Sequence, residues 1–467
     1  MMALSQADMN ERLQDYGKRI ESLAKSVGLD YHPVDFELVP NNFMNEVAIY
    51  GLPIRMPHWS FGVRYIHQLI RQSMGHSRIF EVMFPGNPCH GYLVNSNTLA
   101  ENTLVTAHVL GHADFAKNNH LFARFAEMSG TNIVEHAAAQ AHRIEEAVRN
   151  HGQQRVEALL DAALALEPHV DLDQELHRPL YPTNAKPAPK SAAAPDDPFN
   201  DRFRHLPGEA GPAAATKERK QAPIPPHPES DLLWFIAHYS PELEDWERDV
   251  FLAVRHESFY FFPVFACNIM NEGWATYWHA RLLREADFLP EELYLDAITC
   301  HSNVVRPFAG EQQAALAINP YHVGFSMWER IVEKQGLERA REIRRDEDDF
   351  GFIRNYLDAE LADKLGLFVY EAKSDDGIKV TARDVNKVRE AILAPKFNYG
   401  APRIHVGEMR ADGTLVLVHD HAADGRGLDL ERAARVLQYV HRAWRRPVML
   451  QTVDSRGSPH ELRSATP

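Results

Sequence analysis

Cysteine, positive charge and long apolar runs are all scarce in this chain of 467 residues. Its three cysteines, Cys89, Cys267 and Cys300, lie far apart and form no CxxC pair, which argues against a zinc knuckle or a dithiol redox motif. No apolar run approaches the roughly 20 residues that span a bilayer, and residues 1–25 lack the apolar core of a signal peptide. We therefore expect a cytoplasmic protein without a membrane span.

The shortage of positive charge also limits the partners. The chain has 50 Lys and Arg against 65 Asp and Glu, a formal net charge of −15. Binding to phosphate backbones requires a basic surface, so nucleic acid is not expected as a partner. A hydrophobic content of 45% and a charged content of 25% are typical of a soluble globular protein.

Helical periodicity dominates the chain and predicts a mainly α protein with a smaller α+β C-terminal domain. Residues 1–181 are expected to form the helical and mixed first part of a core, and residues 230–365 its helical remainder. Residues 366–467, where apolar residues alternate, are expected to form the α+β domain. Residues 182–229 are rich in Pro and Ala and poor in large apolar residues, which predicts a disordered insertion.

Two predicted helices carry side chains that bind metals. His108 and His112 are four residues apart and therefore lie on one helical face, the usual way to give one metal two imidazoles. Glu272 and His279 are seven residues apart, about two turns, and also share a face. We predict a metal site with these four residues as ligands. The alternative is that such spacings arise by coincidence on surface or core helices.

Two further features of the sequence allow other interpretations of the site. Glu135 and His142 are again seven apart, on a predicted helix from about 132 to 150. A solvated helix face explains them equally well, but they also allow a two-metal carboxylate and histidine site, which would favour iron or manganese. Residues 300–305 and 319–325 mix polar groups with turns between helices, where groups lining a cleft are commonly found.

Several long motifs stand out, namely Tyr50 to Pro53, Pro57 to Gly62, Ala107 to Phe115, Lys117 to Asn119, Asp231 to Trp234 and Ile269 to His279. Through these motifs the chain resembles the SpoVR (stage V sporulation protein R) family over nearly its whole length apart from the insertion. The resemblance implies a role in building the spore cortex or in a stress or envelope response. It also implies partners, a PrkA-type AAA+ serine kinase and a von Willebrand factor A-type protein, but no settled activity.

The chain departs from the family pattern immediately before the last of these motifs. Family members have Pro-Gln and then Thr-Lys there, whereas this chain has Pro263-Val264 and Cys267-Asn268. If the family's lysine has a function, this protein has lost it.

His108, His112 and Glu272 together resemble the ligand set of gluzincin metallopeptidases, which suggests a zincin-like helical core. In those enzymes a glutamate follows the first histidine and acts as general base, but Val109 stands there in this chain. The acids that could replace it are Glu101, Asp114, Glu135 and Glu257.

Two functional hypotheses follow. The first is a hydrolase that uses a divalent metal ion, zinc in the first place, on a peptide or peptidoglycan-type amide. The second is a non-enzymatic scaffold that joins the kinase to its partner, with the His and Glu residues forming a buried polar network.

Overall fold

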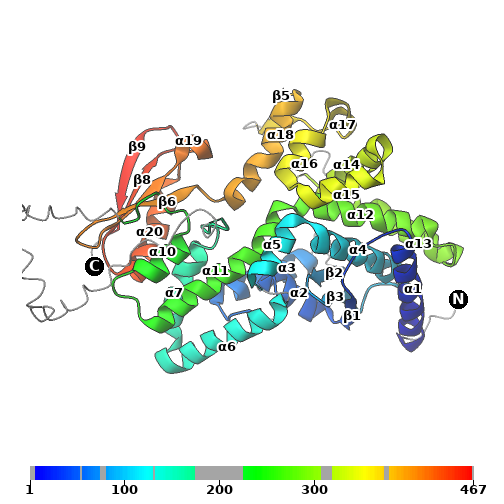
Figure 1. Cartoon of the computed structure of the whole chain (residues 1–467), viewed down its shortest axis with the longest axis horizontal. Helices are drawn as coiled ribbons and strands as arrows, with labels where there is room; N and C mark the ends of the chain where they lie inside the picture. Colours follow the sequence, from blue (N-terminus) through cyan, green and yellow to red (C-terminus); the bar gives the residue numbers. More distant parts are fainter. Residues whose placement is uncertain are drawn as a thin grey trace, which may run out of the picture. The chain divides into compact units, whose positions relative to one another are not determined.

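The computed structural model describes residues 6–52, 55–73, 80–129, 132–173, 224–306, 318–372 and 378–464. Within these residues the protein is mainly helical, as the sequence predicts, and has a small four-stranded sheet near the C-terminus (Figure 1). The chain forms two compact units, residues 1–157 with 256–401 and residues 158–255 with 402–467. Most of the predicted insertion, 182–229, lies outside the described residues.

Helix α4 (Leu99–Asn118) is the central element of the first unit. It begins with a capping box, in which the Thr98 hydroxyl accepts from the Glu101 backbone N–H and the Glu101 carboxylate accepts from that of Thr98. Nearly every residue of α4 is buried, which explains why its apolar residues do not form a single stripe.

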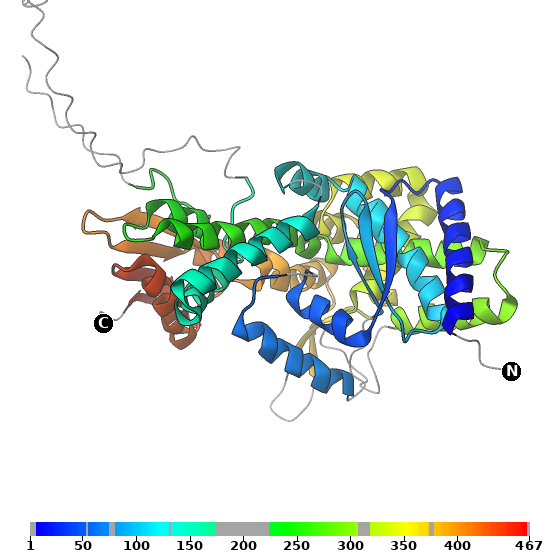
Figure 2. The ribbon, with the colours of Figure 1, turned by 90° about the horizontal axis from the view of Figure 1, so that it is seen from below.

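A three-stranded sheet lies along one side of α4 (Figure 2). Its strands are β1 (Val34–Val39), β3 (Cys89–Val94) and β2 (Glu81–Phe84), in that order. Strand β1 runs parallel and β2 antiparallel to β3. Val109 faces this sheet, because its side chain lies close to Gly91 on β3 and is fully buried.

Helices α12 (Asn268–Glu285) and α13 (Glu291–Val304) pack against α4 and against each other, and α14 (Pro320–Gln335) packs against α12. The start of α12 is fixed by Asp349, whose carboxylate accepts from the backbone N–H groups of Ile269 and Met270 at 2.9 and 2.8 Å. The remaining helices of this unit are α1 (Gln6–Ser26), α2 (Asn41–Tyr50), α3 (Trp59–Ser73), α5 (His120–Ser129), α6 (Ile133–His151), α15 (Leu337–Asp346), α16 (Asp349–Tyr356), α17 (Ala359–Lys364), α18 (Val385–Leu393) and the 3-10 helix η1 (Ala394–Gly400).

The hairpin β4 (Val369–Ala372) and β5 (Ile378–Ala382), with helix α18 after it, belongs to the first unit and not to the C-terminal sheet. The reason is packing: Val388, Ile392 and Leu393 of α18 are buried in the main core cluster together with Trp328 and Phe352. The first strand after residue 366, β4, therefore pairs with β5 and does not join the four-stranded sheet.

The second unit contains a sheet of strands β6 (Ile404–Met409), β7 (Leu415–His419), β8 (Val448–Val453) and β9 (Pro459–Arg463), in that order. Strands β7 and β8 are parallel, and helix α20 (Leu430–Trp444) connects them after the short α19 (His421–Asp424). Helix α10 (Leu232–Tyr239) stacks Phe235 on Trp444. Helices α7 (Gln153–Ala165) and α11 (Asp245–Ala266) contribute residues to both units.

Among the described residues, no single helix has the length and apolar character needed to cross a membrane. Helices α11 and α12, which are bent by 60° relative to each other, reach that length and apolarity only when taken as a pair.

Candidate metal centre

Small residues let helix α12 approach both α4 and α14 closely. A Cβ atom built on Gly111 of α4 would lie 2.7 Å from the Cα of Ala275 on α12. A Cβ on Gly273 of α12 would lie 2.3 Å from the carbonyl carbon of Gly324 on α14. Any side chain at these positions would push the helices apart. The short interhelical distances place one turn of α4 against one turn of α12.

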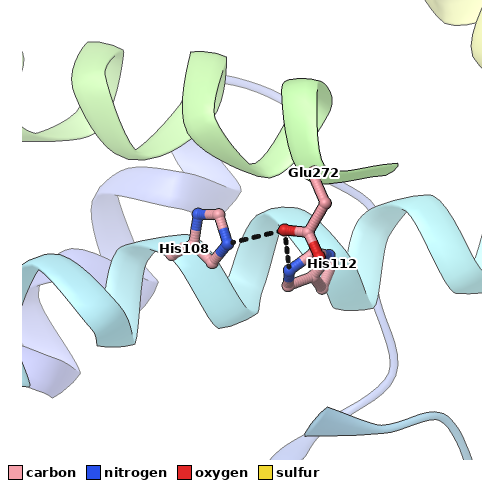
Figure 3. A group of neighbouring side chains, drawn as sticks. All are labelled: His108, His112 and Glu272. Atoms are coloured by element: carbon pink, nitrogen blue, oxygen red, sulfur yellow. Dashed lines mark ion pairs between the residues drawn. The ribbon is translucent and has the colours of Figure 1, made fainter. Parts of the chain in front are cut away.

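At this crossing His108, His112 and Glu272 converge (Figure 3). One ligand atom of each lies within 4.8 Å of the others. Both histidine Nε2 atoms are 3.5 Å from Oε2 of Glu272. Tetrahedral zinc, with bonds of about 2.1 Å, holds neighbouring ligand atoms roughly 3.4 Å apart. The separations therefore match those of ligands around one ion.

Two atoms of this group are buried and have no hydrogen-bond partner among the described residues. They are Nε2 of His108 and Oε2 of Glu272, which face each other. A buried polar atom that makes no hydrogen bond costs about 1–3 kcal/mol, and a charged one costs more. The donor set of two imidazoles and one carboxylate is one that zinc prefers, so the residues fit a divalent ion.

Two of the three groups, His108 and Glu272, have the charge of a metal ligand. Burial would raise the pKa of Glu272, but His112 and His108 outweigh it and hold that pKa well below its usual range. Burial, followed by the nearby His112, lowers the pKa of His108 to about 4. Burial lowers the pKa of His112 as well, but the Glu272 carboxylate more than offsets this and raises it. At neutral pH, Glu272 is thus an anion and His108 a neutral imidazole, the forms that bind metals.

Hydrogen bonds on the far side of each imidazole orient the two rings. Nδ1 of His112 lies 2.8 Å from Oδ1 of Asn271. Since an amide oxygen only accepts, His112 donates from Nδ1, so the neutral form of this ring has its lone pair on Nε2. Nδ1 of His108 lies 2.9 Å from Nδ1 of His279. Metal-binding histidines are typically held by such contacts.

The structure therefore places His279, a predicted ligand, behind His108 and outside the group of three converging residues. It is 1% exposed, and its other ring nitrogen faces His301 at 2.7 Å. Of the four predicted ligands, His108, His112 and Glu272 are brought together.

The four acids proposed as general bases lie elsewhere. Glu101 caps α4, and Glu135 is exposed in the first turn of α6. Glu257 pairs with Arg55 at 2.6 Å. Asp114 accepts from the Trp274 indole and from the backbone of Asp30, both at 2.8 Å, and it also pairs with Arg344.

His142, which the two-metal alternative would use together with Glu135, has a side chain that is 76% exposed. It lies 3.6 Å from Glu145 on the same helix and does not join the three converging residues.

Glu81, which is not among the site residues predicted from the sequence, faces the centre from strand β2. Its Oε1 lies 3.8 Å from Nε2 of His108. Burial and the charge of Glu272 raise the pKa of Glu81 to about 7. The side chains of Glu81 and Glu272 are 16% and 20% exposed, against 3% for His108, so the centre is open on the side of the two carboxylates. Glu81 is a charged residue in a short, otherwise apolar strand, and this contrast is the feature of the sequence that could have identified it as a site residue.

Tyr321 of α14 completes the surroundings of the centre. Its ring centroid lies 6.0 Å from that of His108. The Glu272 charge, followed by burial, raises the pKa of Tyr321 well above its usual range. Tyr321 and His301 both fall in the two segments that the sequence marked as lining a cleft.

Comparison with known proteins matches nearly the whole chain to one protein family. Residues 7–400 match the family described as SpoVR like protein, and residues 402–455 match the SpoVR-like C-terminal domain. The chain is similar to the uncharacterised protein YcgB of Escherichia coli (strain K12), with 28% identity over 493 residues, covering 97% of this chain and 94% of that protein. No solved structure matches the chain.

Proposed function

The chain belongs to the SpoVR family, and from this premise we propose that it is a metal-dependent hydrolase of peptide or peptidoglycan-type amides. It holds one divalent ion, zinc in the first place, between His108, His112 and Glu272. The observation that carries the proposal is the pair of buried atoms without hydrogen bonds, His108 Nε2 and Glu272 Oε2, that face each other at 3.5 Å. A cation between them removes the cost of leaving both unsatisfied.

The number of protein ligands favours catalysis over a purely structural ion. Structural zinc sites usually have four protein ligands, whereas catalytic sites have three and an open position. Three residues converge here, and the open side is lined by carboxylates that remain partly exposed. A divalent ion in this position supplies Lewis acidity to a substrate carbonyl.

Glu81 has the position of the general base that Val109 cannot provide. It faces His108 from the open side and lies outside the three converging residues. A carboxylate in this position would accept a proton from an attacking water molecule and return it to the leaving amine. The Tyr321 hydroxyl keeps its proton and donates a hydrogen bond to the Glu272 carboxylate, which helps to hold that ligand in place.

The arrangement is similar to that of zincins at the level of the ligands. Two histidines one turn apart on α4 and an acid from the later helix α12 form the set. The base differs, because it comes from a strand and not from the helix of the two histidines. The zincin-like core that we propose therefore rests on the similarity of the ligand set.

Elemental analysis of protein purified without chelator tests the proposal. We expect close to one zinc, or another divalent ion, per chain, and its loss in the double variant His108→Ala, His112→Ala. The control His142→Ala keeps its metal, because that side chain is largely exposed and lies against Glu145. A chelator should lower the melting temperature, since an ion at 100 times its Kd stabilises the folded state by about 2.7 kcal/mol. Metal-free protein with a melting temperature that a chelator does not change would refute the proposal.

A scaffold is the second candidate function, and one observation favours it. His108 and His112 each make a hydrogen bond within the protein, to His279 and Asn271, as members of a structural polar network would. In that case the implied partners, the PrkA-type kinase and the von Willebrand factor A-type protein, bind equally well to wild type and to Glu272→Ala. Metal-free protein that binds these partners would favour the scaffold.

A further inference from the structure

Three histidines from three helices form a continuous row that begins at the metal centre. His108 of α4 contacts His279 of α12 through their Nδ1 atoms at 2.9 Å. Nε2 of His279 contacts Nδ1 of His301 on α13 at 2.7 Å. The row runs from the buried ring of His108 to the half-buried ring of His301.

The chemistry of the rings gives this row a direction. When Nε2 of His108 binds a metal, the proton of that ring is on Nδ1, and it is donated to Nδ1 of His279. His279 must then carry its own proton on Nε2, from which it donates to Nδ1 of His301. Each neutral imidazole accepts on one side and donates on the other, so every ring nitrogen within the row is satisfied.

The surroundings favour neutral rings throughout. Burial, followed by the neighbouring histidines, lowers the pKa of His279 well below its usual value. Burial and then Arg284 lower the pKa of His301, whose ring also packs edge-on against Phe325 with centroids 5.2 Å apart. No carboxylate hydrogen-bonds to His279 among the described residues, so its orientation depends on the other two rings.

We propose that His279 and His301 are positioning residues, which hold His108 in the tautomer and orientation that present Nε2 to the metal. His279 is thus a support for a ligand and not a fourth ligand. This inference rests on the proposed metal site. Through His301, helix α13 affects the metal affinity although it contributes no ligand.

The test compares two substitutions of His279 by their zinc affinity, measured by competition with a chromogenic chelator. His279→Gln keeps an acceptor for His108 and a donor for His301, so we expect an affinity within a few-fold of wild type. His279→Phe keeps ring bulk but removes both hydrogen bonds, and zinc should bind about 10–100-fold more weakly, the usual effect of losing such a support. His142→Ala is the matched control for the loss of one histidine.

Nitrogen NMR of histidine-labelled, zinc-loaded protein supplies a readout that a merely structural role would not change. In wild type and in His279→Gln we expect a protonated Nδ1 on His108 whose hydrogen exchanges slowly with water. In His279→Phe that hydrogen should exchange rapidly. Equal zinc affinity and equal exchange in the Gln and Phe variants would overturn the inference.

Where His279→Phe does not fold, His301→Ala carries the test, because it removes the acceptor of the His279 Nε2–H from a half-buried position. A measurable loss of zinc affinity supports the row, and an unchanged affinity overturns it. The two proposals fail differently. Wild type that binds no zinc refutes the metal centre itself, whereas wild type that binds zinc as tightly as His279→Phe refutes only the positioning role.

Discussion

Gly273→Ala probes the contact between α12 and α14, next to the ligand Glu272. The new Cβ would lie 2.3 Å from the carbonyl carbon and 2.4 Å from the Cα of Gly324, both backbone atoms that cannot rotate away. Ordinary carbon contacts are about 3.5 Å, so α12 and α14 must separate by about 1 Å. Such overpacking costs about 1–3 kcal/mol, while alanine in a helix gains about 1 kcal/mol over glycine. We expect a net loss of up to about 2 kcal/mol.

Gly62→Ala is the matched control. Gly62 lies within helix α3, and a Cβ there would have no atom within 4 Å. That variant should gain up to about 1 kcal/mol from helix propensity alone. Urea unfolding of both variants measures the difference, and zinc competition measures the effect on the centre, because Gly273 directly follows Glu272. If Gly273→Ala is as stable as Gly62→Ala and binds zinc normally, the close approach of α12 and α14 does not position Glu272.

Three further predictions concern single side chains. Glu272→Gln should lose at least 10-fold in zinc affinity, whereas Glu81→Gln should stay within a few-fold, because Glu81 lies outside the three converging residues; equal losses would contradict this assignment. Thr98→Ala should cost about 1 kcal/mol in urea unfolding without changing the metal content, since it breaks only the helix cap. In metal-free protein, His108 stays neutral down to about pH 4 while the unfolded chain takes up a proton below about 6.5. Stability is therefore lost as the pH falls from 6.5 to 4, by about 3 kcal/mol, and the melting temperature of His108→Leu should depend less on pH over this range.

Much of the centre was visible in the sequence because helical spacing is a local property. His108 and His112 share a face of α4 whatever surrounds that helix, and the spacing of Glu272 and His279 likewise predicted that they share a face of one helix. The mainly helical fold and the family follow from the same local patterns. Periodicity alone, however, could not exclude that the histidine pair was a coincidence.

The use of the remaining acids depended on partners far away in the chain. Asp114 pairs with Arg344, 230 residues later, and Glu257 pairs with Arg55, 202 residues earlier. These contacts form only when sequence-distant elements pack, so spacing along the chain could not show that both acids are already engaged.

Local patterns in the sequence thus sufficed to predict the family, the helices and four candidate ligands, His108, His112, Glu272 and His279. Which of these side chains converge depends on tertiary packing, through the close helix contacts at Gly111 and Gly273. That packing brought Glu81 from a strand to the open side of the centre and placed His279 behind a ligand. The physical reason is that a helix fixes which side chains share a face, whereas the face that another element covers is set by packing between distant parts of the chain.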